Sequence, residues 1–305
     1  PGSQGFDDVL TTHKPGAGPE CKYPEDWHHV REITERATQF IEANKDKSFF
    51  CYVSHNSVHD PFKEKASLIE KYKSKPGAEK KGRLNYIQGA MMETMDNSVG
   101  TILAKLSELG LEKNTMVVFF SDNGQKGPKE GKPFRGSKGD LYEGGVHMPL
   151  LIKWPAIVAA GTTCDGMMVS DDFFPTLNEL AGADPQVKDL DGLSFAHLLK
   201  NPELKSKRDS IYWHFPHYHG EGLAPSGAIR AGKYKLIEWF EPSKYGKEGA
   251  FELFDLEKDP GEQNNLVNSM PELADQLVKK LKEWRVEVGA QKMTKADPNY
   301  KTKSN

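Results

Sequence analysis

Amphipathic helical patterns alternate with short apolar runs through the first two thirds of this 305-residue chain. The apolar runs are shorter than most buried helices and are typical of strands that are covered on both faces. We expect strands at 48–54 (SFFCYVS), 115–121 (TMVVFFS) and 149–154 (PLLIKW), and helices at 27–44, 84–109 and 170–182. This alternation predicts an α/β layer built on a mostly parallel sheet that is flanked by helices.

The pattern changes beyond about residue 205, where strand-like runs follow one another without helices between them. These runs are 210–215 (SIYWHF), 227–240 (GAIRAGKYKLIEWF) and 250–256 (AFELFDL), and a charged helical pattern follows at 270–286. Successive strands that are joined by turns favour an antiparallel sheet. We therefore predict an α/β domain over residues 1–205 and a smaller α+β domain over residues 206–305.

Charge and cysteine content exclude several classes of function. The chain has 41 basic and 44 acidic residues spread along its length, so neither a nucleic-acid-binding face nor a binder of anionic membranes is indicated. Its three cysteines, Cys21, Cys51 and Cys164, lack metal-ligand spacing, which argues against both a disulfide framework and a zinc site. No apolar stretch reaches the roughly 18 to 20 residues of a membrane span.

Two oxygen-bearing side chains follow the predicted strand at 115–121. In a parallel α/β sheet, ligands bind where loops converge at the carboxyl ends of strands, and Asp122 and Asn123 lie at such an end. A carboxylate beside a carboxamide offers hard oxygen ligands for Ca²⁺ or Mg²⁺. The alternative is that Asn123-Gly124 forms a tight hairpin turn. The next apolar run lies too far along the chain for that reading, so we favour the metal site.

Lys138 stands in a loop that is rich in glycine. Most loop lysines are simply solvated, but Lys138 is bracketed by Gly136, Gly139, Gly144 and Gly145. Glycines allow backbone to approach backbone closely and can fold such a loop into a pocket. A lysine held there would present a point charge to an anionic oxygen.

His55 and His59 follow the predicted strand at 48–54. Their spacing of four would place both rings on one helical face, but Pro61 favours a loop, so a zinc pair is not predicted. A histidine at a strand end can be a structural hydrogen-bonding residue, a general acid or a partner for an oxyanion.

Several of these segments together resemble the sulfatase family of the alkaline-phosphatase-like superfamily. The resemblance rests on SDNG followed by RGSKGDLYEGGVHMPLLIKWP. In addition, SFFCYVSHNSVHDPF resembles the strand with the family's His-x-Pro, SDDFFPTLNELAG its following helix, and ELFDLEKDPGEQNNL its C-terminal closing motif. The resemblance covers nearly the whole chain and implies an alkaline-phosphatase-like fold. Arg135 and Glu143 also match, and we interpret them as residues that order the loop.

The resemblance implies roles for four residues. Asp122 and Asn123 are similar to the ligands that hold the family's divalent cation, usually Ca²⁺. Lys138 is similar to the lysine that contacts the sulfate and the departing oxygen. His59 is similar to the histidine that binds sulfate and can protonate the leaving group. The implied reaction is attack of a hydrated formylglycine on sulfur, with the cation and positive side chains stabilising the sulfuryl oxygens.

The family's nucleophile is absent from these residues. It lies in Cys-x-Pro-x-Arg or Ser-x-Pro-x-Arg, and neither motif occurs here, since Cys21 is followed by KYPED. The paired aspartates that complete the family's metal site are absent too. We therefore expect the C-terminal two-thirds of a sulfatase, N-terminally truncated, with an incomplete Ca²⁺ site and no turnover of its own. Its sheet would expose an unpaired edge that invites the missing N-terminal segment or a second chain.

A cluster of histidines in the C-terminal region suggests a substrate-binding patch. His214, His217 and His219 surround Pro216 and Tyr218, and imidazole and aromatic groups together suit a sugar ring. The alternative is an aromatic hairpin with exposed histidines. We expect a sulfated carbohydrate or aryl sulfate as substrate, with no nucleic acid as partner.

Two other functions remain open at this point. One is a phosphodiesterase or phosphonate ester hydrolase of the same superfamily, since the metal ligands and the anionic substrate would be similar. The other is a non-catalytic binding remnant, which the absent nucleophile permits. The family is mostly periplasmic, secreted or lysosomal, so the resemblance suggests a periplasmic or secreted protein, although this chain carries no targeting signal.

Overall fold

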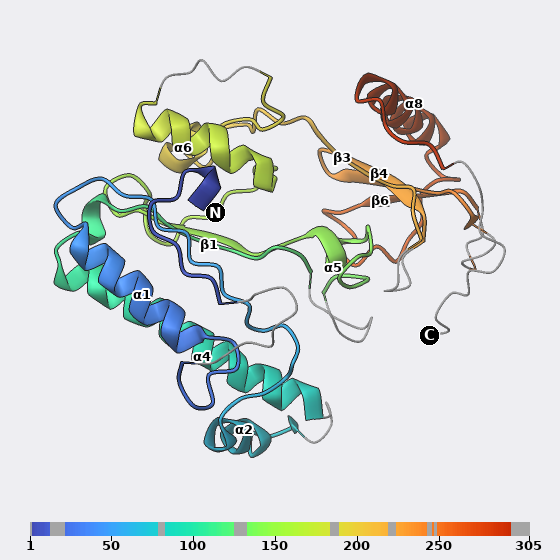
Figure 1. The fold of residues 1–305 in the computed structure, drawn as a ribbon. Helices are drawn as coiled ribbons and strands as arrows, with labels where there is room; N and C mark the ends of the chain where they lie inside the picture. Colours follow the sequence, from blue (N-terminus) through green and yellow to red (C-terminus); the bar gives the residue numbers. More distant parts are fainter. Residues whose placement is uncertain are drawn as a thin grey trace. The chain divides into compact units, whose positions relative to one another are not determined.

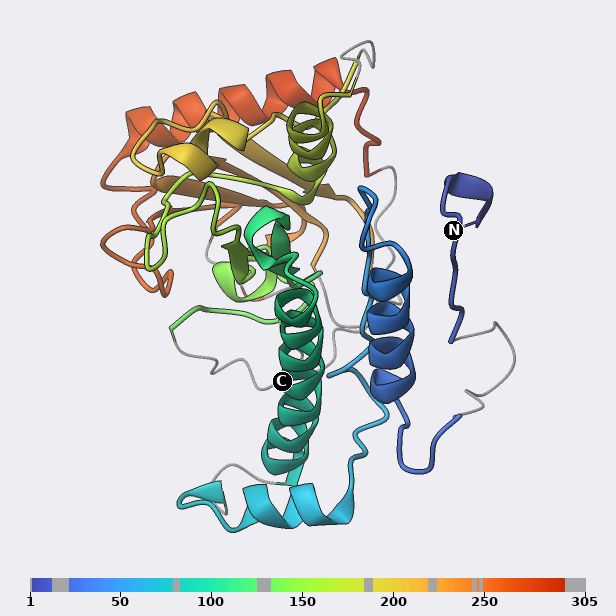
Figure 2. The ribbon, with the colours of Figure 1, turned by 90° about the vertical axis from the view of Figure 1, so that its left-hand side faces the viewer.

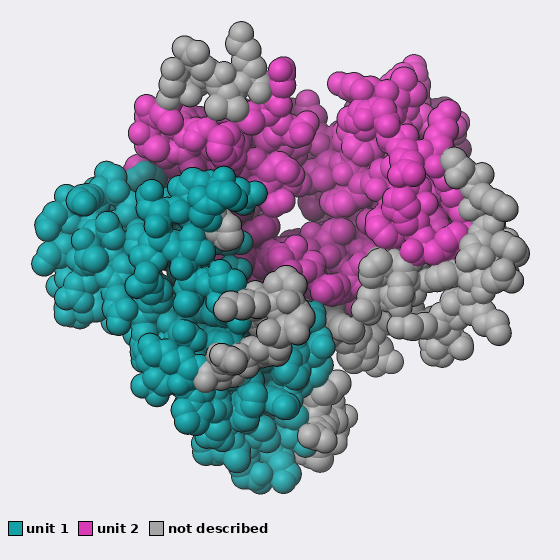
Figure 3. Space-filling view, viewed as in Figure 1, with its two compact units in different colours: residues 1–116, 154–156 teal, residues 117–153, 157–305 magenta. Residues whose placement is uncertain are grey.

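A computed structural model describes residues 2–12, 22–78, 83–124, 133–183, 189–218, 224–242, 246 and 249–293. Internal contacts divide the chain into two compact units, which Figure 3 colours separately. Unit 1 comprises Pro1–Met116 and Trp154–Ala156, and unit 2 comprises Val117–Lys153 and Ile157–Asn305. The predicted boundary between residues 205 and 206 stays a prediction.

Unit 1 is helical. Its helices are α1 (Val30–Ala43), α2 (Ala66–Lys73) and α4 (Arg83–Glu108), with short 3-10 turns at Gly2–Gln4 and Glu112–Asn114. Helices α1 and α4 lie side by side in Figures 1 and 2, and α2 packs against α4. The buried residues of α1 recur at helical spacing: Val30, Ile33, Ala37 and Ile41. Both long helices predicted from the sequence are confirmed.

The segment at 48–54 in unit 1 corrects one prediction. It was expected to be a buried strand, but it forms no strand, and Phe50 and Tyr52 are 58% and 70% exposed. Phe49 packs against Phe40 of α1, with the ring centroids 5.9 Å apart. A strand needs a neighbouring backbone to pair with, and none of the described residues supplies one.

Unit 2 contains the other two strands predicted in the first half of the chain. Strands β1 (Val117–Phe120) and β2 (Leu150–Lys153) pair antiparallel, with Val117 opposite Lys153. The sequence predicted a mostly parallel layer, but no parallel pair occurs among the described strands. A parallel pair needs a long crossover, usually a helix, whereas the described part of this connection holds only the four-residue helix α5 (Glu143–Val146).

Helix α6 (Phe173–Ala181) follows a 3-10 turn at Ser170–Asp172, which agrees with the helix predicted at 170–182. It ends at Gly182, whose φ of 66° is the left-handed conformation that glycine adopts without strain. Phe173 packs on Phe120 of β1 with ring centroids 5.2 Å apart. Helix α7 (Ala196–Lys200) follows along the chain.

The C-terminal sheet is antiparallel, as predicted. Its strands, in the order in which they pair, are β3 (Ser210–Phe215), β4 (Ser226–Ala231), β5 (Tyr234–Trp239) and β6 (Phe251–Asp255). Helix α8 (Pro271–Glu287) covers one face, seen in red in Figure 1. On that face Ile229, Leu236 and Leu253 form a buried cluster with Leu277 and Leu281 of the helix.

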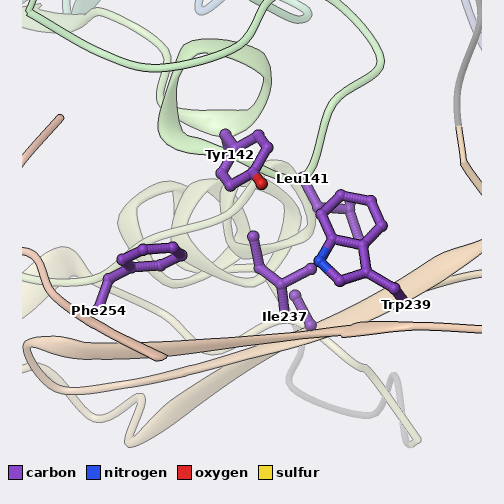
Figure 4. Packing of buried hydrophobic residues seen from close by; sticks show 6 residues of the cluster. Leu141, Tyr142, Ile237, Trp239 and Phe254 are labelled. Atoms are coloured by element: carbon purple, nitrogen blue, oxygen red, sulfur yellow. The ribbon is translucent and has the colours of Figure 1, made fainter. Parts of the chain in front are cut away.

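The opposite face of this sheet is covered by the glycine-rich loop rather than by a helix. Leu141 and Tyr142 lie over Ile237, Trp239 and Phe254, as Figure 4 shows. Successive strand residues point to opposite faces, so Ile237 faces the loop while its neighbour Leu236 faces α8. The loop at 133–147 is therefore part of a hydrophobic core, which positions the residues that it carries.

Candidate active site

Asp122 and Asn123 directly follow β1, as expected. Asp122 is exposed, and its Oδ1 accepts a hydrogen bond of 2.9 Å from the Asn123 backbone N–H. The Gly124 N–H donates to the Gly145 carbonyl at 3.1 Å. The chain therefore bonds across the loop at this point, and β1 pairs with β2 rather than with an adjacent strand among the described residues. A tight turn at Asn123-Gly124 would run into residues 125–132, which lie outside the described residues, so that alternative stays untested.

Three glycines allow backbone segments to meet around that bond. A Cβ atom on Gly124 would lie 2.0 Å from the Gly144 oxygen, and one on Gly144 would lie 2.5 Å from the Arg135 oxygen. A Cβ on Gly145 would lie 2.1 Å from the Asp140 oxygen. All three distances are too short for any side chain, because the neighbouring atoms belong to the backbone. The glycine content of the loop is explained by this close approach.

Lys138 lies in a tight turn of the same loop. The Asp140 N–H donates to the Ser137 carbonyl at 2.9 Å, and the Ser137 N–H donates to Asp140 Oδ2 at the same distance. Gly136 and Gly139, on either side of Lys138, have φ angles of 80° and 93°. Lys138 is half-buried, and its ammonium has no hydrogen-bond or ion-pair partner among the described residues. The use of Lys138 for anion binding stays a prediction.

A buried ionic cluster holds the helix α5 end of the loop. Glu143 Oε1 lies 2.9 Å from Lys235 Nζ, and Glu262 Oε1 lies 3.1 Å from the same ammonium. The second oxygen of Glu262 accepts the Glu143 backbone N–H at 2.6 Å. The side chains of Lys235 and Glu262 are fully buried. A buried charge needs partners of this kind, since solvent cannot stabilise it.

The second oxygen of Glu143 has its own partners. His147 Nδ1 lies 2.9 Å away, and Arg230 Nη1 lies 3.7 Å away. Burial by itself would raise the pKa of Glu143, but His147, Lys235 and Arg230 outweigh burial and lower it to about 2. Burial raises the pKa of Glu262, and Lys235 offsets only part of that rise. Glu143 is therefore an ionised anchor for the loop at neutral pH.

Arg135 holds the other end of the loop. Its Nη1 donates to the Glu262 backbone carbonyl at 2.9 Å, and its guanidinium lies 4.1 Å from the centroid of the Tyr142 ring. The Tyr142 hydroxyl donates to Glu252 Oε2 at 2.5 Å, and burial is the first cause of its raised pKa. These contacts agree with the interpretation of Arg135 and Glu143 as loop-ordering residues.

The two histidines that follow the predicted strand at 48–54 differ in environment. His59 is half-exposed, and its Nδ1 lies 2.8 Å from Asp60 Oδ1. His55 Nε2 lies 3.0 Å from Ser98 Oγ, and burial lowers the pKa of its imidazole. Ser98 also bonds to Thr34 of α1, so His55 belongs to a link between helices. His59 is thus the histidine of the pair that is open to a ligand.

The C-terminal histidine cluster is described in part. His214 Nε2 bonds to the Gln291 carbonyl at 2.7 Å, and its ring centroid lies 5.7 Å from that of Phe240. His217 packs edge-on against Phe215. His219 lies outside the described residues. The use of these histidines for substrate binding stays a prediction.

Comparison with known proteins gives the family directly. The family described as Sulfatase matches residues 2–183, more than half of the chain. The chain belongs to the sulfatase family. The family described as N-sulphoglucosamine sulphohydrolase, C-terminal, matches residues 137–287. The sulfatase region thus includes both the Asp122 strand end and the Lys138 loop, and the second match runs on through the C-terminal sheet and α8.

Individual relatives place this sulfatase chain among longer proteins. It is 33% identical to a sulfatase of Formosa agariphila over 270 residues, covering 80% of this chain and 47% of that protein. It is 31% identical to human arylsulfatase A over 262 residues, covering 79% and 49%. The crystal structure of Ps i-CgsB in complex with k-i-k-neocarrahexaose matches with 25% identity and a TM-score of 0.72, covering 90% and 57%. The chain spans about half the length of the curated relatives that it matches.

Sulfatases are generally metal-dependent, and the described residues of this chain fit part of a cation site. Asp122 and Asn123 offer a carboxylate and a carboxamide, both hard oxygen donors, on a strand end that the Gly124–Gly145 hydrogen bond fixes. The described residues contain no group of three or more His, Cys, Asp or Glu side chains that could hold a metal ion. Two donors fall short of the six to eight that Ca²⁺ takes, so this pair by itself is not a complete Ca²⁺ site.

Lys235 and Glu262 were missed by the sequence reasoning. Lys235 shares the face of β5 with Ile237 and Trp239, which lie in the core beneath the loop. The signal was present, because a lysine on the apolar side of an alternating strand needs a buried partner. Nothing in the spacing indicated that its partners would be Glu143 and Glu262.

Proposed function

We propose that these residues supply the anion-binding side, and part of the cation site, of a sulfuric ester hydrolase. The observation that supports the proposal is the junction at Gly144 and Gly145. The strand end with Asp122 and the turn with Lys138 both pack against this pair of glycines. An ammonium without a partner among the described residues and two oxygen donors are thereby held on one backbone framework.

In this proposal, Lys138 contacts the sulfate and the oxygen that departs with the alcohol. A lysine acts as a compact positive charge, which fits that role. The ammonium of Lys138 would be held in position before the reaction begins. A charge that need not move during the reaction stabilises a developing negative charge best. His59 is the residue that we propose to protonate the leaving group, and its imidazole is half-exposed.

Asp122 and Asn123 hold the divalent cation, for which we propose Ca²⁺. Asp122 Oδ1 already accepts the Asn123 N–H, which orients the carboxylate and leaves Oδ2 without a hydrogen bond among the described residues. When bound, the cation would supply positive charge that stabilises the sulfate oxygens. The remaining cation ligands would come from other residues than these two.

The nucleophile is not supplied by these 305 residues in our proposal. Formylglycine, which the family forms from Cys or Ser, attacks sulfur as its hydrate, and neither parent motif occurs in this sequence. We therefore propose that the chain alone binds sulfate without turning over a sulfate ester. A segment that carries Cys-x-Pro-x-Arg or Ser-x-Pro-x-Arg would complete the site.

A carbohydrate sulfate is the substrate class that we favour. His214 and His217 both pack against aromatic rings, and such groups suit the faces and hydroxyls of a sugar. The similar structure of Ps i-CgsB was solved in complex with k-i-k-neocarrahexaose, which supports the same class. An aryl sulfate is the alternative, because the chain is also similar to human arylsulfatase A.

We propose a periplasmic or secreted location from the family alone. Among the described helices, none has the length and apolar character to cross a lipid bilayer. That finding leaves the compartment to experiment, and fractionation of the cells that make the protein would test the proposal.

Turnover assays of the purified chain test the function. The chain, a Lys138→Ala variant, and the chain mixed with a segment that carries formylglycine would each be given p-nitrophenyl sulfate and a sulfated oligosaccharide with Ca²⁺. We expect turnover only in the mixture, and its loss in the mixture made with Lys138→Ala. Turnover by the chain alone above the variant, or a fully active Lys138→Ala mixture, would refute the assignment.

A further inference from the structure

Glu262 is joined to both ends of the loop that carries Lys138. Its side chain accepts the Glu143 backbone N–H at 2.6 Å, and its backbone carbonyl accepts Arg135 Nη1 at 2.9 Å. Glu143 begins α5 at the end of the loop, and Arg135 precedes Lys138 by three residues. One residue therefore clamps the loop on either side of the lysine.

Glu262 has an unfavourable backbone conformation and is buried, which indicates that its side chain is specifically required. Its φ is 52°, in the left-handed region where glycine is favoured, and it lies fully buried. A fully buried carboxylate in a conformation that favours glycine costs stability twice, through backbone strain and through desolvation. The contacts that offset both costs are those to Glu143 and Lys235.

Lys235 connects this clamp to the C-terminal sheet. Its ammonium lies 2.9 Å from Glu143 Oε1 and 3.1 Å from Glu262 Oε1. Because β5 is paired on both sides, with Arg230 of β4 and Phe254 of β6 opposite Lys235, the position of its backbone is fixed by the sheet. The sheet thus fixes the position of the Lys235 ammonium, and the ammonium in turn fixes the position of the Glu143 side chain.

From Glu143 the connection continues through backbone bonds to the predicted cation ligands. Gly144 donates to the Arg135 carbonyl at 2.7 Å, and Gly145 accepts from Gly124 at 3.1 Å. Gly124 directly follows Asn123. A shift of Glu143 would therefore move the Lys138 turn and the Asp122–Asn123 strand end together.

We propose that Lys235 and Glu262 are positioning residues for the anion-binding side of the sulfatase site. They act through Glu143 and Arg135 and need not touch the substrate. This inference rests on the proposed function for its effect on sulfate, while its effect on the loop is independent of that function.

Four variants of the full chain separate positioning from plain structural support. Glu262→Gly relieves the left-handed backbone but removes the clamp, and Glu262→Gln keeps one acceptor oxygen. Lys235→Met removes the buried charge, and Lys233→Met is the matched control, since Lys233 is partly exposed and pairs with Asp255. The measurements are amide hydrogen exchange at Gly124 and Gly144, normalised to α8, and the affinity for inorganic sulfate.

We expect Glu262→Gly and Lys235→Met to speed exchange at both glycines by about tenfold relative to α8, because the loop opens without the helix. Sulfate affinity should fall by about tenfold, since small misplacements of a binding group are costly. Glu262→Gln should recover part of both losses, and Lys233→Met should match the parent.

If folded Glu262→Gly keeps the exchange rates and the sulfate affinity of the parent, the proposal is overturned. Such a result would show that the loop keeps its position without the Glu262 side chain. If Lys235→Met fails to fold, the Glu262→Gly and Glu262→Gln pair decides the matter. If the parent binds no sulfate, the proposed function fails, while the exchange rates still confirm or refute the positioning of the loop.

Discussion

The loop at 133–147 in unit 2 and the segment at 48–62 in unit 1 both carry residues predicted to meet a sulfate. The loop is fixed by backbone hydrogen bonds at Gly144 and by a fully buried ionic cluster around Lys235. In the segment, Phe50 and Tyr52 are mostly exposed, and the side chain of His59 bonds only to its neighbour Asp60 among the described residues. The same predicted chemistry thus rests on two different kinds of support.

The difference shows how a site residue can be made rigid. Lys138 is half-buried on a loop whose own sequence is polar and glycine-rich, so its position is set by the sheet beneath it. His59 lies beyond a run that is apolar but lacks a pairing partner among the described strands. The buried charges hold the loop in one position, and they also make the loop sensitive to single substitutions.

Loss of the central ammonium should have the largest effect. Lys235→Met leaves Glu143 and Glu262 as neighbouring buried carboxylates, so we expect a loss of about 3 to 5 kcal/mol in the free energy of unfolding. Urea unfolding followed by tryptophan fluorescence measures it. The control Lys233→Met should cost much less than Lys235→Met, because its ion pairs are partly exposed to solvent. Equal losses in the two variants would contradict the contrast.

Matched glycine-to-alanine substitutions in the two units should change stability in opposite directions. Gly144→Ala places a Cβ 2.5 Å from two backbone oxygens, so we expect it to destabilise by about 1 to 3 kcal/mol. Gly100→Ala in α4 meets nothing within 4 Å and should stabilise by up to about 1 kcal/mol. Thermal unfolding of both variants checks the signs, and a neutral Gly144→Ala would show that the loop can open at little cost.

Acidification should weaken unit 1 before the loop. Burial lowers the pKa of His55 below 6.5, so the unfolded state binds the proton first and the stability that His55 contributes falls once pH drops below 6.5. The pKa of Glu143 is lowered to about 2, so its contribution is complete above 4.5 and falls only between 4.5 and about 2. Hydrogen exchange at Ser98 and at Gly144 across this range measures each region.

A His55→Gln variant serves as the control for this pH response. It should remove the loss of protection in α4 below pH 6.5 and leave Gly144 unchanged. Parallel losses at Ser98 and Gly144 in the parent would show that one titration governs both regions.

Removal of His59 should have the smallest effect on stability. Its side chain is half-exposed and bonds to Asp60 alone among the described residues, so we expect His59→Ala to change the free energy of unfolding by no more than about 0.5 kcal/mol. His55→Ala, which breaks the bond to Ser98, should cost about 1 to 2 kcal/mol. The same urea titration compares them, and a larger loss for His59→Ala would show that its segment is more firmly held than its contacts indicate.

Periodicity in the sequence predicted the helices well, because each has one apolar stripe that must be buried. Helices α1, α4 and α8 lie within a few residues of their predicted bounds, and the antiparallel C-terminal sheet followed from strands without intervening helices. The strand at 48–54 was predicted wrongly. An apolar run indicates that a segment suits a sheet, but a strand also requires a neighbouring backbone.

Motif spacing predicted that the Asp122 strand end and the Lys138 loop belong together, since both are part of one signature. The sequence by itself thus determined the family and the helices, while the candidate ligands stay a prediction. Only the tertiary structure decided what holds the loop, because Glu143, Lys235 and Glu262 are distant along the chain and each is an ordinary charged residue until its partners are known. Burial of a charge depends on the whole fold, and local sequence cannot specify it.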